Sequence, residues 1–376
     1  MQRNVTDTIT PNTRSYKLYY ILAICGLVVL MTSTLATCQT LLGVFNGNPS
    51  STVMTVYSNM QTWENKPNAV GTEYVTWCPR DITYTFDIAQ ELWTDNNVPE
   101  IVWQPEDLGC KTDTSDPDTQ IASGQWDTYM TDFFNAAKTF LAGPDAVYGT
   151  YDDRRIYIRF AHEPNGNWYP WSPAYSGSTD TPADYINMWI HVVTMARNMG
   201  LDSNHIQFMW NVNTTDVGAY TAEELFPGNT YLNWVSIDGY NWGTSTSYGT
   251  WQTAEQVFGN MVSRVKTLST LPLAITEVGS VSYTSSGESV SAKAAWITDY
   301  FNNFIPGNAI KMTCWFNIDQ SGEKDWAIFG GKYGDEKYGS YNAYTEYANG
   351  VASSSIIGSS PTNPNLLTNA QFAGTL

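Results

Sequence analysis

The chain has 376 residues, and its 36 acidic residues against 18 basic ones give a formal net charge of −18. This charge excludes nucleic acid as an expected partner, because backbone phosphates bind a basic surface. Aromatic residues make up 14% of the chain, and many fall in predicted loops, which favours a cleft for flat, neutral rings over a role in the core alone.

The N-terminal segment predicts targeting to the cell exterior. Residues 18–36 are apolar and follow three basic residues, and the small side chains at 36–38 suit cleavage. We therefore expect residues 1–38 to be a signal peptide and the rest of the chain to be secreted. The alternative is that residues 18–36 stay as a single membrane anchor, with the remaining chain outside the cell.

From residue 39 to residue 350 the pattern alternates between strands and helices. Eight short runs rich in β-branched and aromatic residues predict strands. They are Leu41–Phe45, Glu73–Trp77, Glu100–Gln104, Arg155–Ala161, His205–Asn211, Trp234–Tyr240, Leu273–Glu277 and Ile310–Phe316.

Apolar residues at helical spacing lie between several of these strands. The three clearest stripes begin at Ile186, Val257 and Trp296. Thr181 and Thr221 are expected helix starts. Eight strand–helix units over residues 39–350 predict one α/β domain, a (β/α)8 TIM barrel, whose usual size is about 250 residues plus loop insertions. A doubly wound open sheet is the alternative, but the first strand is not followed by the glycine-rich phosphate turn that such a sheet normally carries.

Three cysteines lie beyond the targeting segment. Cys78 and Cys110 sit at or beyond predicted strand ends, so we expect that they can pair as a disulfide in an oxidising compartment. Cys314 lies inside a strand and is expected to be a buried thiol. The sequence has no Cys-x-x-Cys and its three histidines are scattered, so neither a metal nor a cofactor is expected.

The most informative stretch runs from Arg159 to Trp171. A strand ends at the pair His162 and Glu163; Pro, Asn and Gly then break regular structure, and three aromatic residues follow within four positions. A carboxyl fixed at a strand end, with flat apolar faces in the loop beyond it, is what a sugar-cleaving site needs. We therefore expect a carbohydrate site here.

A second carboxyl is expected to face the first. Glu277 closes the seventh predicted strand as Glu163 closes the fourth, and strands four and seven lie on opposite walls of a barrel mouth. Hydrolysis of a glycosidic bond needs a proton for the leaving oxygen and a carboxylate at the anomeric carbon. Two glutamates in different environments can divide these tasks, one protonated and the other ionised.

Three stretches together resemble glycoside hydrolase family 26: His-Glu-Pro-Asn-Gly-Asn-Trp-Tyr-Pro-Trp at 162–171, Val-Ser-Ile-Asp-Gly-Tyr-Asn-Trp at 235–242 and Ile-Thr-Glu at 275–277. The similarity covers residues 43–347. It implies a retaining barrel glycosidase in which Glu163 is the acid/base and Glu277 the nucleophile. Retention implies carboxyl groups about 5–5.5 Å apart, against roughly 6.5–9.5 Å in an inverting enzyme.

The resemblance also implies roles for residues around the two carboxyls. His162 is expected to hydrogen-bond in the site, Tyr240 to hold the nucleophile, and Trp168 to stack on the leaving-group side. Trp315 is expected to form the apolar floor under the sugar. Arg159 is expected to brace both glutamates or, alternatively, to fill the barrel as part of an ion pair. The expected set is completed by Trp171, Asn211, Trp242 and Trp103, with packing an equal alternative for the last three.

The resemblance implies a secreted endo-acting enzyme on a wall polysaccharide, with β-1,4-mannan first because most of the family cleaves it. Two departures favour mixed-linkage β-glucan: the run Trp168 to Trp171 differs from the usual Trp-Phe-Trp-Trp, and Gln104 stands where mannanases tend to have a histidine. β-1,3-Xylan is a further alternative. A non-catalytic carbohydrate-binding or wall-tethering protein, the rival class, would be signalled by loss of either glutamate, and both are present.

The last residues, 351–376, differ in composition from the predicted barrel. Residues 351–365 are rich in Ser, Pro, Asn and Thr and predict a linker. Residues 365–375 resemble the opening strand of a jelly-roll carbohydrate-binding module, and a disordered tail is the alternative.

Overall fold

The computed structural model describes residues 39–111, 116–359 and 368–375. The expected signal peptide or membrane anchor at residues 1–38 lies outside these ranges. Within them, no helix is both long and apolar enough to cross a bilayer. All described residues fall in one unit of the chain, residues 38–376.

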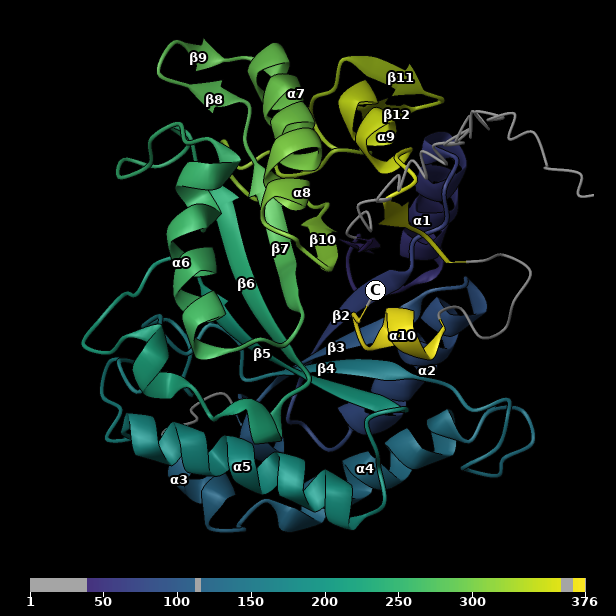
Figure 1. The fold of residues 1–376 in the computed structure, drawn as a ribbon, viewed down its shortest axis with the longest axis vertical. Helices are drawn as coiled ribbons and strands as arrows, with labels where there is room; N and C mark the ends of the chain where they lie inside the picture. Colours follow the sequence, from purple (N-terminus) through teal and green to yellow (C-terminus); the bar gives the residue numbers. More distant parts are fainter. Residues whose placement is uncertain (1–38, 112–115, 360–367, 376) are drawn as a thin grey trace, which may run out of the picture. The chain divides into compact units, whose positions relative to one another are not determined.

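The centre of the fold is a closed barrel of eight parallel strands (Figure 1). The strands are β1 Thr40–Phe45, β2 Val70–Thr76, β3 Val98–Gln104, β4 Ile156–Phe160, β5 Ile206–Asn213, β6 Trp234–Asn241, β7 Leu273–Ser280 and β10 Met312–Phe316. Each strand pairs with the next, and β1 pairs with β10 from Leu41↔Met312 to Phe45↔Phe316, which closes the ring. The predicted (β/α)8 barrel is confirmed, with strand ends shifted by a few residues.

Helices surround the strands (Figure 1). The longer ones are α1 Ser51–Glu64, α2 Asp81–Thr94, α4 Asp127–Leu141, α5 Pro182–Asn198, α6 Ala254–Leu268 and α7 Val290–Asp299, and the short ones are α3 Pro117–Ala122, α8 Ile305–Gly307, α9 Thr345–Val351 and α10 Asn369–Phe372. Thr181 begins α5 as expected. Its hydroxyl accepts from the Asp184 backbone N–H (3.4 Å), and the Asp184 carboxylate accepts from the Thr181 backbone N–H (2.8 Å), a reciprocal cap.

The connection from β5 to β6 differs from the expectation. Thr221 starts only a 3₁₀ turn, Ala222–Leu225, and not a full helix, although Glu224 caps it reciprocally. The remaining short elements are the 3₁₀ turns Leu108–Cys110 and Asn229–Tyr231, the π-helix Tyr300–Phe304, the hairpin strands β8 Tyr283–Thr284, β9 Gly287–Glu288, β11 Glu336–Tyr338 and β12 Tyr341–Ala343, and β13 Ile356–Ile357.

Polar side chains occupy the barrel interior. Thr72 on β2 donates its hydroxyl to Glu100 on β3 (2.6 Å), and Glu100 pairs with Arg159 on β4 (Oε1 to Nε, 3.0 Å). All three are buried. The larger apolar cluster lies between strands and helices, where Trp103 of β3 stacks on Phe133 of α4 with ring centroids 4.0 Å apart. A smaller one, which includes Leu41 and Val70, lies where the strands begin. Because the interior is polar, it can support charged groups at the mouth.

Residues 360–367 of the predicted linker and module strand lie outside the described residues, and the described parts on either side form a short strand and a helix. Ile356–Ile357 pairs in parallel with β1. Residues 369–372 form helix α10, and buried Phe372 packs on Tyr157 with ring centroids 4.7 Å apart, while its carbonyl accepts the Tyr157 hydroxyl (3.0 Å). Tyr157 clusters with residues that begin the strands, such as Leu41 and Val70. Phe372 therefore covers apolar surface at the end of the barrel opposite the mouth, which favours a helix docked there over a free strand.

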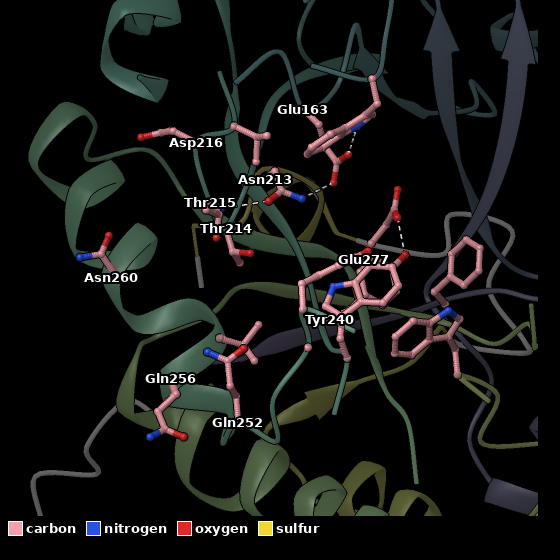
Figure 2. A pocket seen from close by; sticks show the side chains of 18 of the residues that line it. Glu163, Asn213, Thr214, Thr215, Asp216, Tyr240, Gln252, Gln256, Asn260 and Glu277 are labelled. Carbon is pink, nitrogen blue, oxygen red and sulfur yellow. Dashed lines mark hydrogen bonds between the residues drawn. The ribbon is translucent and has the colours of Figure 1, made fainter. Parts of the chain in front are cut away.

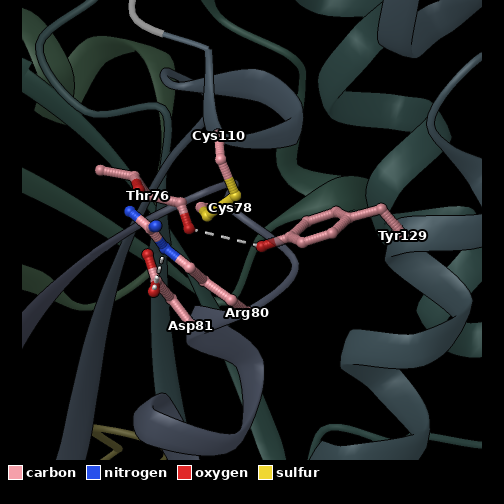
Figure 3. Close-up of a disulfide and its surroundings, with 6 residues drawn as sticks. All are labelled: Thr76, Cys78, Arg80, Asp81, Cys110 and Tyr129. Atoms are coloured by element: carbon pink, nitrogen blue, oxygen red, sulfur yellow. Dashed lines mark hydrogen bonds and ion pairs between the residues drawn. A yellow bond between two sulfur atoms is a disulfide. The ribbon is translucent and has the colours of Figure 1, made fainter.

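The predicted disulfide between Cys78 and Cys110 is present, with a Cα–Cα distance of 4.5 Å (Figure 3). It joins the segment after β2 to the turn after β3. Beside it, Tyr129 of α4 donates its hydroxyl to the carbonyl of Thr76 (3.5 Å). Cys314 is free and buried, as expected.

Candidate active site

One cleft opens at the C-terminal ends of the barrel strands, where barrel enzymes carry their active sites. Its volume is about 1200 Å³. Glu163, just after β4, and Glu277, in β7, both line it and point into the same space (Figure 2). The two carboxyls that the sequence predicts to face each other therefore share one pocket.

Glu163 is held by three groups. Its backbone has φ of 50°, in the left-handed region that a residue with a side chain rarely adopts, and its N–H donates to Oδ1 of Asn211 (3.1 Å). Asn213 donates its Nδ2 to Oε1 of Glu163 (3.0 Å), and Trp168 donates its Nε1 to Oε2 (2.9 Å). A Cβ at Gly166 would lie 2.5 Å from the Trp168 ring, so the loop needs glycine there to let the indole fold back onto Glu163.

Burial raises the pKa of Glu163 to about 7, and the nearby negative charge of Glu277 adds to this rise. The hydrogen bonds from Asn213 and Trp168 oppose it, because they stabilise the ionised carboxylate. Glu163 is therefore protonated in mildly acidic solution and can still lose its proton near neutrality.

Glu277 has the opposite ionisation. Burial alone would raise its pKa, but the charge of Arg159 and hydrogen bonds from Tyr240 and Tyr74 outweigh burial and lower the pKa to about 2. Arg159 donates Nη1 to Oε1 of Glu277 (2.8 Å), Tyr74 donates its hydroxyl to Oε1 (2.5 Å), and Tyr240 donates its hydroxyl to Oε2 (2.5 Å). The two glutamates thus differ in protonation over a wide pH range.

Arg159 joins the nucleophile candidate to the barrel interior. Besides Glu277 it contacts Glu100 and, through Nη1, Oδ2 of Asp238 on β6 (2.5 Å). Asp238 also accepts the Thr276 hydroxyl (2.7 Å). Burial raises the pKa of both Glu100 and Asp238, so Glu277 is the carboxyl of the three whose pKa is lowered. Among the described residues no hydrogen bond or ion pair joins Arg159 to Glu163, but the Arg159 charge lowers the pKa of both glutamates. Arg159 therefore acts electrostatically on both and also forms ion pairs inside the barrel.

His162 is buried, and burial together with the Arg159 charge lowers its pKa to about 3, which leaves the imidazole neutral. Its Nε2 hydrogen-bonds the Tyr169 hydroxyl (2.9 Å), and Tyr169 lines the cleft. Trp171 is buried beneath them, where it stacks on Tyr169 and donates its indole N–H to the His162 carbonyl (2.7 Å). Trp171 therefore supports the loop and does not line the cleft.

The aromatic lining of the cleft differs from the expectation at Trp315. This indole is buried between the barrel and its helices, packed on Tyr300 and Tyr347, because residues of a strand alternate between two faces and Trp315 faces outward. Its neighbour Phe316 faces the cleft instead. Trp315 acts indirectly, since its Nε1 donates to the carbonyl of Trp326 (2.9 Å), and Trp326 contributes to the wall.

Trp168 and Trp242 line the cleft as expected, and the Trp168 side chain is 39% exposed. Trp103 does not line the cleft. It is fully buried in the core against Phe133, which agrees with the alternative that it has a packing role. Asn211 is also buried, and donates Nδ2 to the hydroxyls of Ser236 (3.1 Å) and Thr276 (2.9 Å) while it holds the Glu163 backbone.

Many of the lining residues were not among the predicted site residues, and Tyr74, Asn213, Phe45 and Trp326 are four examples. Tyr74 and Asn213 lie on predicted strands or just after them, so the alternation of strand faces could have drawn attention to both. Phe45 ends β1 and could have been found in the same way. Trp326 comes from the long segment between β10 and β11, which has no periodicity, and no sequence signal places it in the cleft.

A (β/α)8 barrel with two facing carboxyls of different ionisation is typical of glycoside hydrolases. Residues 150–312 match the model of glycosyl hydrolase family 26. Over 259 residues the chain is 30% identical to Endoglucanase H of Acetivibrio thermocellus, in a match that covers 68% of this chain and 25% of that protein. The chain thus spans a quarter of the length of this curated relative. The chain belongs to glycoside hydrolase family 26.

Solved structures share the fold. A family 26 β-mannanase from Bacteroides ovatus has a TM-score of 0.57 and 13% identity, covering 86% of this chain and 91% of that one. A modular endo-β-1,4-mannanase from Cellulomonas fimi has a TM-score of 0.58 and 14% identity, covering 88% and 73%. At these identities the likeness concerns the barrel fold alone.

Proposed function

We propose that this chain is a retaining endo-β-glycosidase that hydrolyses a wall polysaccharide. The observation that carries the proposal is the pair Glu163 and Glu277 in one cleft, the first with its pKa raised to about 7 and the second with its pKa lowered to about 2. Between these values one carboxyl holds a proton and the other carries a charge, as a double displacement requires.

In the first step Glu277 attacks the anomeric carbon while Glu163 gives its proton to the departing glycosidic oxygen. Water then attacks the same carbon, gives a proton to Glu163, and returns the electron pair of the ester bond to Glu277. Each step inverts the anomeric centre, so the product retains the starting configuration. Trp168 and Asn213, which hold Glu163, belong to the leaving-group side of the cleft.

The lining favours cleavage within a chain. The lining includes the neighbouring rings of Phe45 and Phe316, from β1 and β10, together with Thr215 beyond β5 and Asn260 of α6, and the cleft is open to solvent. Aromatic faces and amides along such a groove can hold sugar rings on both sides of the two carboxyls. A chain can therefore lie across the site without its end being threaded in.

The finer proposal concerns the backbone of the polysaccharide. Identity of 30% to a protein named as an endoglucanase supports a β-glucan, together with Gln104 and the run Trp168 to Trp171. Family frequency supports β-1,4-mannan, the first expectation from sequence. We place β-glucan first, because the mannanase structures share only 13–14% identity with this chain. Initial rates on barley β-glucan, galactomannan and β-1,3-xylan at equal mass concentration decide among them; a preference for galactomannan would reverse this order.

Two isosteric variants test the catalytic roles. A 2,4-dinitrophenyl glycoside has a leaving group that departs without a proton. Glu163→Gln should therefore still release dinitrophenolate while losing polysaccharide hydrolysis, and Glu277→Gln should lose both. The anomer of the first product, followed by NMR, should be the retained one. An inverted product, or near-normal polysaccharide turnover by either variant, contradicts the proposal.

We also propose that the protein acts outside the cell. The Cys78–Cys110 disulfide supports this, because structural disulfides persist mainly in oxidising compartments. Fractionation of the producing cells would locate it, and intact-mass measurement would determine whether residues 1–38 remain attached.

A further inference from the structure

The two carboxylate oxygens of Glu277 have unequal partners. Oε1 accepts two hydrogen bonds, from the Tyr74 hydroxyl (2.5 Å) and from Nη1 of Arg159 (2.8 Å), whereas Oε2 accepts one, from the Tyr240 hydroxyl (2.5 Å). A carboxylate oxygen offers two lone-pair positions. Oε1 is therefore fully engaged, and Oε2 keeps one lone pair free.

We propose that Oε2 of Glu277 forms the bond to the anomeric carbon, and that Tyr74 is a positioning residue that holds Oε1 and speeds release of the sugar. The inference rests on the proposed role of Glu277 as the nucleophile. In the covalent intermediate Oε2 is the ester oxygen and Oε1 the ester carbonyl oxygen, still held by Tyr74 and Arg159.

The donors on Oε1 act differently in the two chemical steps. In the first step the Oε2 electron pair forms the new C–O bond as the glycosidic bond breaks, so the carboxylate loses its charge. In the second step water attacks, Glu163 takes a proton from it, and the electron pair returns to Glu277. Hydrogen bonds to a charged oxygen are stronger than those to a neutral carbonyl, so Tyr74 favours the second step, in which the charge returns.

The surroundings of Tyr74 hold its hydroxyl in place. β2 pairs with β1 at Val70 and Gly71, and within the described part of the chain no strand pairs with Tyr74 on that side. Asn48 takes that place: its Nδ2 donates to the Tyr74 carbonyl (2.8 Å), and its Oδ1 accepts from the Tyr74 N–H (2.8 Å). Phe45 packs edge-on against the Tyr74 ring, and Nη2 of Arg159 donates to the Tyr74 hydroxyl (3.3 Å).

Tyr74→Phe tests the assignment, with a 2,4-dinitrophenyl β-glucosyl disaccharide as substrate, or the mannosyl counterpart if mannan proves to be cleaved. We expect kcat and KM to fall together by about ten-fold or more, with kcat/KM within about three-fold of the parent, because only in the second step does the Tyr74 hydrogen bond strengthen towards the transition state. The glycosylated protein should accumulate in the steady state, seen as added mass. A fall in kcat/KM equal to that in kcat, with KM unchanged, or no change at all, overturns the assignment.

Tyr57→Phe is the matched control, because the Tyr57 hydroxyl is also buried and donates to a carbonyl, that of Val44 (3.0 Å), away from the cleft. It should lower stability and leave both kcat and KM unchanged. If Tyr74→Phe does not fold, Asn48→Ala loosens the same tyrosine and should shift kcat and KM in the same direction. Proteolysis of the glycosylated protein, which locates the residue that carries the sugar, then separates the role of Glu277 from that of Tyr74. A sugar bound to another residue refutes Glu277 as the nucleophile. A sugar on Glu277 that does not accumulate in the variant refutes only the role of Tyr74.

Discussion

Trp168, in the wall of the cleft, donates its indole N–H to Oε2 of Glu163 at 2.9 Å. The bond stabilises the ionised form and so holds the pKa of Glu163 lower than burial alone would. In its proposed role as the acid of the first step Glu163 must be protonated, so activity should be lost as pH rises through its pKa of about 7. Trp168→Phe should therefore move the alkaline limb of the kcat/KM profile to higher pH, by up to about one unit.

Trp242→Phe is the control for this shift. Trp242 also lines the cleft, but none of its described contacts reaches Glu163. It should weaken substrate binding and leave the alkaline limb where it is. An unmoved limb in Trp168→Phe, or an equal movement in both variants, would show that the indole N–H does not set this pKa.

Arg159 is a single guanidinium among three buried carboxyls, and its removal should be costly. Arg159→Met leaves Glu100, Asp238 and Glu277 without their cation, and breaking a buried pair costs about 3–5 kcal/mol of folding free energy. The pKa of Glu277 should rise, so the acid limb of the kcat/KM profile should move to higher pH. Chemical denaturation and a pH profile measure the two effects.

The comparison for Arg159 is Arg264→Met. Arg264 pairs with Asp216 and Glu223 at a partly exposed site on α6, where an ion pair contributes about 0–1 kcal/mol. Arg159→Lys adds a graded variant, since one ammonium nitrogen cannot replace both Nη1, which contacts Glu277 and Asp238, and Nε, which contacts Glu100. Equal losses of stability in Arg159→Met and Arg264→Met would rule out the buried network as the source of the effect.

The features that the sequence could predict are those that depend on local pattern. Runs of β-branched residues predict the strands, and an acidic residue at the end of two of them marks Glu163 and Glu277. Barrel geometry then predicts that strands four and seven lie on opposite walls of the mouth. The prediction that Trp315 forms the floor of the cleft is wrong. Side chains alternate between two faces along a strand, so an error of one residue assigns a core side chain to the cleft. The places of Trp326 and α10 depend on tertiary contacts that no local pattern encodes. The Trp326 carbonyl accepts the Trp315 indole N–H, and Phe372 of α10 packs on Tyr157.

Glu73 gives the fold an expected dependence on pH. It is fully buried on β2, and burial raises its pKa well above the usual range. Neither of its carboxylate oxygens has a hydrogen-bond partner among the described residues. The folded state therefore binds the proton more tightly than the unfolded state, whose glutamate pKa is about 4.3. The resulting stability is fully present below that value and is lost as pH rises towards the folded-state pKa.

Glu73→Gln removes the charge and keeps the shape, so it should raise the melting temperature at pH 8 by at least about 2 °C and change it little at pH 4. Glu91→Gln is the matched control, because Glu91 is an exposed glutamate on α2. It should show no such difference between the two pH values. A Glu73→Gln effect that is the same at pH 4 and pH 8 would mean that the ionisation of this carboxyl does not limit stability.

The Cys78–Cys110 disulfide closes a loop of sequence separation 32, and a cross-link of this kind stabilises a fold mainly by restricting the unfolded chain, by about 2–4 kcal/mol. The double variant Cys78→Ser with Cys110→Ser should lose that amount in chemical denaturation. Added reductant should lower the stability of the parent to the level of this variant and leave the variant itself unchanged. Because the bond joins the segments after β2 and β3 and does not line the cleft, kcat should fall far less than stability; a variant that unfolds no more easily than the parent would refute a stabilising role for the bond.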